Sequence, residues 1–310
     1  MNVLQVKNIS KQYGTKENTV HALKNISFTV SQGEFTAIVG TSGSGKSTLL
    51  NLIGGLDVPS QGEIIIRKHN IARLRRKELT IFRRRNIGFV FQNYSLMPVL
   101  NVYDNVALPV TFDQGKHADH SYIEELLKEL GLWEKRKRYP NELSGGQQQR
   151  TALARALANK PAVILADEPT GNLDSKTTLE VMGLLKNSSR KYNQTILMVT
   201  HNESLACNCD RILHIEDGRL LQEKESDKSG SYEYQRDLQQ RVRKLEKYDV
   251  FRNENVCWQE NFMKKQMAAG KETHGNENVC WQEIFMKKQT AAGKETYGNE
   301  VRLEMEGWLS

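Results

Sequence analysis

The sequence predicts an α/β fold with a largely parallel sheet. Short apolar runs such as Phe35–Val39 and Val163–Ala166 alternate with segments in which apolar residues have helical spacing. That alternation is typical of parallel strands joined by helices. The first run stops at Gly40 and the second at Asp167 and Glu168. We therefore expect two buried strands that end in a tight loop and in an acidic pair.

The other elements follow from the same patterns. In one segment the apolar residues Ile123, Leu126, Leu127 and Leu130 share a helical face. In chain order, we expect strands at Val3–Ile9, Ala22–Val30, Phe35–Val39, Ile64–Ile66, Ile87–Phe91, Val163–Ala166, Thr195–Thr200 and Ile212–Glu216, and helices that begin near Ser47 and cover Tyr122–Leu132, Gln147–Ala158 and Leu179–Leu185.

The composition limits the class of protein. The first 224 residues carry 30 basic and 22 acidic side chains, whereas the rest of the chain is nearly neutral. A basic domain suits phosphate, anionic lipid headgroups or nucleic acid, but charge alone is explained more simply by an ordinary solvated surface. The four cysteines form no CxxC pair, which fits a reducing compartment. No segment approaches the roughly 18 apolar residues of a membrane span, and the N-terminus lacks the apolar stretch of a signal peptide, so we expect a soluble chain.

The C-terminal part differs in character from the rest. Residues 253–275 recur as residues 276–298 with 20 of 23 positions identical. Two copies are too few to stack as a solenoid, and each difference needs only one base change, so the repeat indicates a recent duplication. Before it, Tyr234, Leu238 and Leu245 have helical spacing. We expect residues 225–310 to form a largely irregular or helical extension.

A glycine-rich loop follows the strand Phe35–Val39. It fits the pattern G-x-x-x-x-G-K-[ST], in which glycines turn backbone N–H groups towards phosphates. The lysine reaches the β- and γ-phosphates, and the following hydroxyl holds Mg²⁺. An ordinary glycine-rich turn is the alternative, but the strand before the loop and the helix after it favour phosphate binding. The expected nucleotide-contacting residues are Gly40, Thr41, Ser42, Gly43, Ser44, Gly45, Lys46, Ser47 and Thr48.

The acidic pair after Val163–Ala166 complements this loop. We expect Asp167 to hold Mg²⁺, directly or through water, and Glu168 to polarise an attacking water molecule. Two solvated acids at a strand end would be the alternative for an isolated pair. Together with a phosphate-binding loop, the pair predicts hydrolysis of a nucleoside triphosphate.

A third motif, Leu143–Gln147, reads LSGGQ and precedes a helix. Its small residues expose N–H groups at a helix N-terminus, where an anion is stabilised; alone, it would be read as a serine cap followed by flexible glycines. Between a phosphate-binding loop and an Asp-Glu strand end, however, it resembles the signature of ABC ATPases. The resemblance covers residues 1 to about 224 and implies that Ser144, Gly145, Gly146 and Gln147 contact nucleotide.

The resemblance implies further roles. Gln92 matches the glutamine that senses Mg²⁺ and faces the membrane partner, and His201 matches the histidine that contacts the γ-phosphate. Tyr13 matches the aromatic residue that stacks on adenine. Residues 171–175, which include Asp174, match a loop that crosses the dimer interface. The Arg67–Asn70 turn departs from the family, in which a glycine is usual, so we expect a distorted surface hairpin there.

The same resemblance implies the domain organisation. We expect an ABC nucleotide-binding domain over residues 1–224, with a RecA-like core of the P-loop NTPase type, an N-terminal antiparallel β-subdomain and a helical signature subdomain at about 93–160. Residues 225–310 have no counterpart in the family.

The expected activity is ATP hydrolysis with ATP and Mg²⁺ as cofactors. The expected assembly is a homodimer of the cassette beneath separate membrane permease subunits, peripheral to the cytoplasmic face of the plasma membrane, with no nucleic acid bound.

Stretches such as ADEPTGNLDS are similar to the branch that contains macrolide exporters, lipoprotein-releasing ATPases and antimicrobial-peptide resistance exporters. That branch implies export or membrane extraction of peptide, lipoprotein or drug. The alternative is a regulatory motor that controls cell-wall hydrolases through membrane partners. A soluble ATPase acting on DNA or ribosomes is disfavoured, because the chain has neither a long coiled-coil insertion nor a second cassette.

Overall fold

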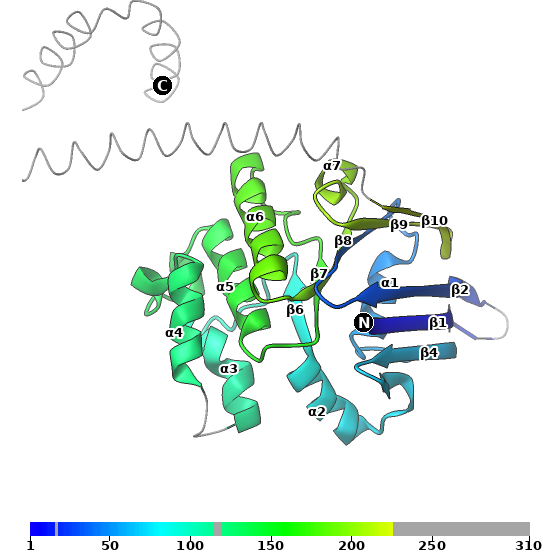
Figure 1. The fold of residues 1–310 in the computed structure, drawn as a ribbon, viewed down its shortest axis with the longest axis horizontal. Helices are drawn as coiled ribbons and strands as arrows, with labels where there is room; N and C mark the ends of the chain where they lie inside the picture. Colours follow the sequence, from blue (N-terminus) through cyan, green and yellow to red (C-terminus); the bar gives the residue numbers. More distant parts are fainter. Residues whose placement is uncertain (16–17, 115–118, 226–310) are drawn as a thin grey trace, which may run out of the picture. The chain divides into compact units, whose positions relative to one another are not determined.

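The computed structural model describes residues 1–15, 18–114 and 119–225. The expected amphipathic segment at Tyr234–Leu245 and the tandem repeat lie outside the described residues. Within the described part, two sheets and a set of helices form the α/β arrangement that the sequence predicts (Figure 1). No helix in this part is long and apolar enough to cross a bilayer.

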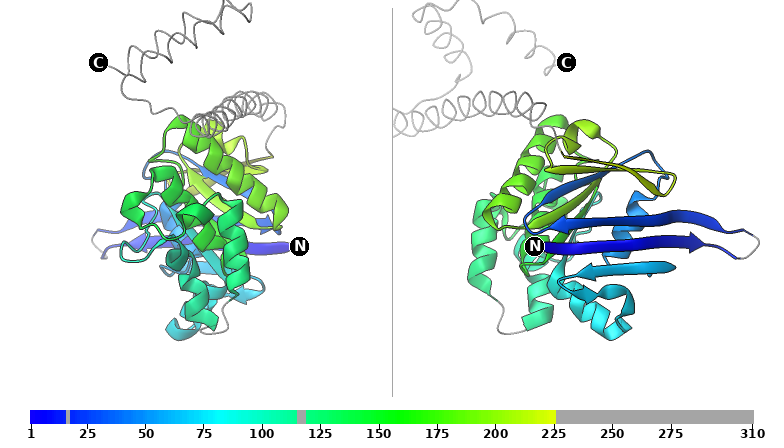
Figure 2. Two further views of the ribbon diagram at one scale, coloured as in Figure 1. Left: turned by 90° about the vertical axis from the view of Figure 1, so that its left-hand side faces the viewer. Right: turned by 45° about the vertical axis from the view of Figure 1, so that its right-hand side comes forward.

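A four-stranded antiparallel sheet begins the chain. Its spatial order is β2, β1, β4 and β5. In β2, the exposure of side chains alternates as expected for a sheet with one covered face. Figure 1 and the right-hand view of Figure 2 show β1, β2 and β4 side by side. The bounds are Asn2–Tyr13 for β1, Val20–Ser31 for β2, Gln61–Ile66 for β4 and His69–Asn70 for β5.

The second sheet has six strands in the order β10, β9, β3, β8, β7 and β6. All neighbours pair in parallel except β9 and β10, which form an antiparallel pair at one edge. Every residue of β3 and β8 is buried, as parallel strands covered on both faces should be. The bounds are Phe35–Val39 for β3, Ile87–Phe91 for β6, Val163–Asp167 for β7, Thr195–Thr200 for β8, Arg211–Glu216 for β9 and Arg219–Glu225 for β10.

Helices cover both faces of the six-stranded sheet. The bounds are Lys46–Ile53 for α1, Arg76–Asn86 for α2, Val102–Gln114 for α3, His120–Glu129 for α4, Gly145–Leu157 for α5, Ser175–Lys191 for α6 and Glu203–Ala206 for α7, with short 3-10 turns at Ile71–Arg73, Trp133–Lys135 and Pro140–Glu142.

Two hydrophobic layers meet at this sheet. Alternate residues of β3 belong to different layers, with Ala37 and Val39 on one side and Ile38 on the other. The first layer packs against α3, α4, α5 and α6. The second packs against α1 and the antiparallel sheet. Consequently α1 and α5 lie on opposite faces of the six-stranded sheet (Figure 1).

The expected strands and helices are confirmed, with ends that shift by a few residues. Helices α2, α3 and α7, strands β5 and β10 and the 3-10 turns were not expected. Helix α3 contains Pro109, which interrupts the helical pattern, and buried Asn105 fixes its start by donating to the carbonyl groups of Met97, Leu100 and Asn101. Strand β10 is polar and is held by its pairing with β9.

The turn between β4 and β5 forms without glycine. Ile66 pairs with His69, so Arg67 and Lys68 make up the two-residue loop. Both have positive φ, of 45° and 70°, as the tight turns of antiparallel hairpins require. The expected distortion is therefore limited to two side-chain-bearing residues in the left-handed conformation, while the strand pairing is regular.

Candidate nucleotide-binding site

The predicted residues gather where parallel strands end. Strand β3 leads into the loop Gly40–Gly45, β6 into Gln92, β7 into Glu168 and β8 into His201. Because these strands run parallel, their carboxyl ends lie at one edge of the sheet. Ligands of open α/β sheets bind at that edge.

Glycine is needed at two points of the phosphate-binding loop. A Cβ atom on Gly40 would lie 2.0 Å from the carbonyl oxygen of Ile215. Gly45 has a φ of 100°, and a Cβ atom there would lie 2.6 Å from the carbonyl oxygen of Ala22. Gly45 also caps α1 without a side-chain hydrogen bond. The free N–H groups of the first turn are therefore suited to an anion.

Lys46 lies inside this loop. Its Nζ donates to the carbonyl oxygens of Gly40 at 2.8 Å and Thr41 at 2.7 Å. Burial lowers the pKa of the Lys46 ammonium, and the nearby carboxylates of Glu168 and Asp167 oppose that shift. Nζ also lies 3.5 Å from the Ser44 hydroxyl. An ammonium that contacts only neutral oxygens of its own loop in this way is suited to take phosphate oxygens in their place.

Ser47 and Asp167 provide a pair of oxygen ligands. The Ser47 hydroxyl lies 3.4 Å from Oδ1 of Asp167. Burial raises the pKa of Asp167, and the Ser47 hydroxyl opposes that effect. Mg²⁺ is usually held by one or two protein oxygens together with phosphate oxygens and water. The pair has the chemistry and the proximity that such an ion requires.

Glu168 and His201 are brought into contact. Nδ1 of His201 lies 2.9 Å from both carboxylate oxygens of Glu168. A carboxylate only accepts hydrogen bonds, so Nδ1 carries the proton and donates. Glu168 has a φ of 44°, and its N–H donates to the carbonyl oxygen of Val199 in β8. A residue with a side chain in this conformation is typical of functional sites.

Gln92 lies against the loop before α6. Its Nε2 donates to Oδ1 of Asn172 at 3.4 Å, and Nδ2 of Asn172 donates to the Gln92 carbonyl oxygen at 3.1 Å. A Cβ atom on Gly171 would lie 2.7 Å from the same Nε2. The end of β6 is thus tied to the loop that the resemblance places at a dimer interface.

Tyr13, at the end of β1, is 42% exposed. Its hydroxyl donates to Oδ2 of Asp57 at 2.7 Å, and Nζ of Lys11 lies 4.7 Å from the ring centroid. The same ammonium pairs with Oδ1 of Asp57 at 2.8 Å. Burial raises the pKa of the Tyr13 hydroxyl, and Asp57 adds to that effect. Asp57 was missed at the sequence level, because it lies 44 residues from Tyr13 and in no recognisable motif.

The segment Ser144–Gln147 is separate from the phosphate-binding loop of the same chain. The Ser144 hydroxyl accepts from the Gln147 N–H at 3.3 Å, and the Ser144 N–H donates to Oε1 of Gln147 at 3.1 Å. A Cβ atom on Gly146 would lie 2.3 Å from the side chain of Thr177. The N–H and the hydroxyl of Thr177 both donate to the carboxylate of Asp174, the N-cap of α6. Among the described residues, no hydrogen bond joins this segment to residues 40–48. One chain therefore presents two separate phosphate-binding candidates.

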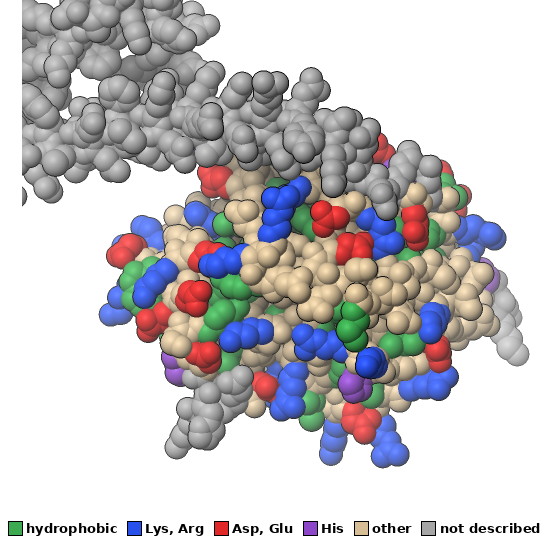
Figure 3. All heavy atoms as spheres, in the orientation of Figure 1, with side chains coloured by type: hydrophobic (Ala, Val, Ile, Leu, Met, Phe, Trp, Pro, Cys, Tyr) green, Lys and Arg blue, Asp and Glu red, His purple; other side chains and the backbone are tan. Residues whose placement is uncertain are grey.

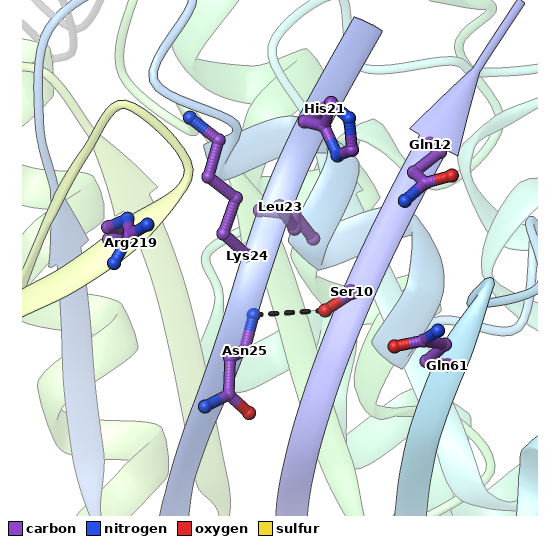
Figure 4. Close-up of a pocket in the computed structure, with 8 residues that line it drawn as sticks. All are labelled: Ser10, Gln12, His21, Leu23, Lys24, Asn25, Gln61 and Arg219. Carbon is purple, nitrogen blue, oxygen red and sulfur yellow. Dashed lines mark hydrogen bonds between the residues drawn. The ribbon is translucent and has the colours of Figure 1, made fainter. Parts of the chain in front are cut away.

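A small cavity lies apart from all of these residues. It has a volume of about 190 Å³ and is lined by Leu23 and by polar side chains of β1, β2, β4 and β10, as Figure 4 shows. The charged groups at its rim include Lys24 and Arg219. None of the predicted nucleotide-contacting residues lines it.

Comparison with known proteins identifies similar chains. A family model described as "ABC transporter" matches residues 23–171. The bacitracin export ATP-binding protein BceA of Halalkalibacterium halodurans is 44% identical over 222 residues, which are 71% of this chain and 87% of that protein. The lipoprotein-releasing system ATP-binding protein LolD of Acinetobacter baylyi is 43% identical over 70% of this chain and 96% of its own length.

Longer relatives and solved structures match the same part. The macrolide export ATP-binding/permease protein MacB of Mannheimia succiniciproducens is 45% identical, and the match covers 71% of this chain but 34% of MacB. A dimeric post-hydrolysis structure of the ATP-binding cassette MJ0796, bound to ADP and Pi, superimposes with a TM-score of 0.67 at 43% identity. That match covers 72% of this chain and 99% of MJ0796.

The contact between Tyr13 and Asp57 leads to a prediction about base recognition. We expect Asp57→Asn to weaken ATP binding by roughly three- to tenfold, because the Tyr13 ring loses a charge-assisted hydrogen bond that orients it. Binding of inorganic triphosphate, which has no base, should be unchanged. Calorimetry with both ligands measures the difference.

Asp113→Asn is the matched control, since Asp113 also forms one ion pair, with Arg85 at 2.7 Å, but far along the chain from Tyr13. Equal weakening of both ligands by Asp57→Asn, or no weakening of either, would contradict a role for Asp57 in orienting Tyr13.

Proposed function

The chain belongs to the ABC transporter family as an ATP-hydrolysing, ATP-binding subunit, and from that premise we propose that it dimerises around two MgATP to drive a separate membrane permease. The main support for this proposal is that the predicted nucleotide-contacting residues lie in two separate places within one chain. The loop Gly40–Gly45, Asp167, Glu168 and His201 meet at the sheet edge, whereas Ser144 caps a helix on the opposite face of the sheet.

Within one chain, we assign each group a step. Lys46 binds the β- and γ-phosphates in place of the carbonyl oxygens that it now contacts. Ser47 and Asp167 would hold Mg²⁺, which neutralises phosphate charge in the transition state. Glu168 accepts a proton from the attacking water molecule, and His201 keeps that carboxylate in place through its Nδ1–H.

The second chain completes the site. Ser144, Gly145 and Gly146 would contact the γ-phosphate held by the partner's loop, and Asp174 and Gln92 would transmit its presence across the interface. The contact between Gln92 and Asn172 supports this link, because it joins the end of β6 to the loop before α6. ATP then acts as the bridge between two chains, and hydrolysis removes the bridge. The dimeric cassettes of MJ0796 support the arrangement.

The coupling surface for the permease is proposed to lie next to the loop after β6. Met97, Val99 and Tyr139 are large apolar side chains that are 46%, 75% and 47% exposed. An open groove lined by Pro98, Tyr139 and charged neighbours runs along this surface. Exposed apolar groups around a groove are typical of a protein interface. These groups support contact with a partner protein, which we propose to be the permease, with the chain attached through it at the cytoplasmic face of the membrane.

The transported substrate is proposed from the relatives alone. Their names describe bacitracin export, macrolide export and lipoprotein release. A peptide, a drug or a lipoprotein moved outward or extracted from the membrane is the class that they share. Transport assays with the co-encoded permease, using each class in turn, would identify the substrate.

The cassette is proposed to end after β10. The sequence placed the boundary at residue 224, and the strand Arg219–Glu225 pairs with β9 to its last residue. Every residue assigned above precedes that strand. We expect a chain truncated after Glu225 to retain MgATP binding and near-complete ATP hydrolysis, measured by phosphate release. Loss of both would place residues 226–310 within the catalytic unit.

The test of the catalytic assignment is Glu168→Gln. Loss of the proton acceptor should lower ATP hydrolysis by about 10²-fold or more, while the ATP bridge is unaffected. The variant should therefore accumulate as a dimer in MgATP, which gel filtration detects. Glu203→Gln, an equivalent change at an exposed position in α7, should hydrolyse ATP normally and show no such accumulation. Persistent hydrolysis by Glu168→Gln, with only monomer present, would exclude Glu168 as the base.

A further inference from the structure

Helix α2 exposes a face that the proposed nucleotide site does not use. Ile81 lies four residues after Lys77 and three and four residues before Arg84 and Arg85, so these side chains border one side of the helix around Ile81. Phe82 is buried in the second hydrophobic layer. Ile81 is 47% exposed, although isoleucine usually lies inside a protein.

This face continues onto the end of α3. The Arg84 guanidinium donates to the carbonyl oxygen of Phe112 at 2.5 Å, and Nε of Arg85 donates to Asp113 at 2.7 Å. Phe112 is 66% exposed. These contacts bring the end of α3, where Phe112 is exposed, next to the two arginine residues. We call Lys77, Ile81, Arg84, Arg85 and Phe112, together with exposed Arg76 at the first position of the helix next to Lys77, the basic α2 face.

The charge around α2 is strongly one-sided. Residues 67–86 contain nine basic side chains and one acidic one. Of these, Arg73 and Arg85 pair with carboxylates of other elements. Within the described part of the chain, no carboxylate lies within ion-pair distance of Arg76 or Lys77, both of which are exposed. Lysine and arginine side chains gather over α2 at the lower edge of the molecule in Figure 3.

The combination selects a class of partner. An ordinary solvated surface would mix both signs of charge and would not expose Ile81 and Phe112 between cations. Nucleic acid would satisfy the cations but not the apolar side chains. A bilayer surface satisfies both, because anionic headgroups attract basic residues and large apolar side chains enter the boundary with the acyl chains.

We propose that the basic α2 face binds anionic phospholipid headgroups at a bilayer surface. Arg76 and Lys77 face the phosphates, and Ile81 and Phe112 enter the interfacial zone. This contact is independent of nucleotide and of the permease, so its test is separate from that of ATP hydrolysis.

The test is co-sedimentation of the full chain with vesicles, without nucleotide. The vesicles contain phosphatidylcholine alone or phosphatidylcholine mixed with phosphatidylglycerol. We expect binding only to the mixed vesicles, and we expect it to weaken as salt is raised. The double variant Arg76→Glu/Lys77→Glu should bind roughly tenfold or more weakly, and Ile81→Ser/Phe112→Ser should bind more weakly at every salt concentration.

The matched control is Lys24→Glu/Arg219→Glu, which makes the same charge change at the cavity of Figure 4. It should bind like the unaltered chain. All variants keep residues 226–310, so a difference between them reports on the substituted face, and retained MgATP hydrolysis shows that each variant is folded.

Two results would overturn the proposal. Equal binding by the α2 variants and the unaltered chain would place lipid contact elsewhere. Absence of binding by the unaltered chain to mixed vesicles would exclude lipid and favour an acidic protein segment as the partner of this face.

Discussion

The arrangement of this cassette depends on a parallel sheet that is buried on both faces. Strands β3, β6, β7 and β8 run in one direction, and their side chains alternate between two hydrophobic layers. Polar groups cannot remain inside such strands at low cost. The loop after Val39, the carboxylate of Glu168 and the imidazole of His201 therefore lie where strands end, and parallel strands end together.

The same two layers separate the phosphate-binding candidates. Helix α1, with Lys46 and Ser47, packs on one face of the sheet, whereas α5, with Ser144 at its cap, packs on the other. Each segment is stable without the other, because Lys46 is held by backbone oxygens and Ser144 by Gln147. In the proposed dimer, ATP would bring the loop of one chain and the Ser144 segment of the other together.

Local patterns predicted much of the fold, and they placed the candidate residues after strands whose ends the structure brings to one sheet edge. Phe35–Val39 and the loop after it are contiguous, so spacing alone was sufficient. Helix α3 was missed because Pro109 interrupts its pattern, and β10 was missed because its polar residues are held by pairing with β9. The contact of Tyr13 with Asp57 joins residues that no local pattern connects. Contacts between distant segments depend on how the layers pack, and the local spacing of apolar residues does not predict that packing.

Mixing two inactive variants tests the central claim, that one nucleotide is held by two chains. Lys46→Ala removes the phosphate-binding ammonium, and Ser144→Arg blocks the opposing segment. Each variant alone should have little ATPase activity, because both sites of its dimer are damaged. A dimer of one of each contains one intact site, so activity should return when the variants are mixed, up to about half the normal activity per mixed dimer if the sites act independently. A mixture as inactive as its components, although mixed dimers form, would contradict a shared site.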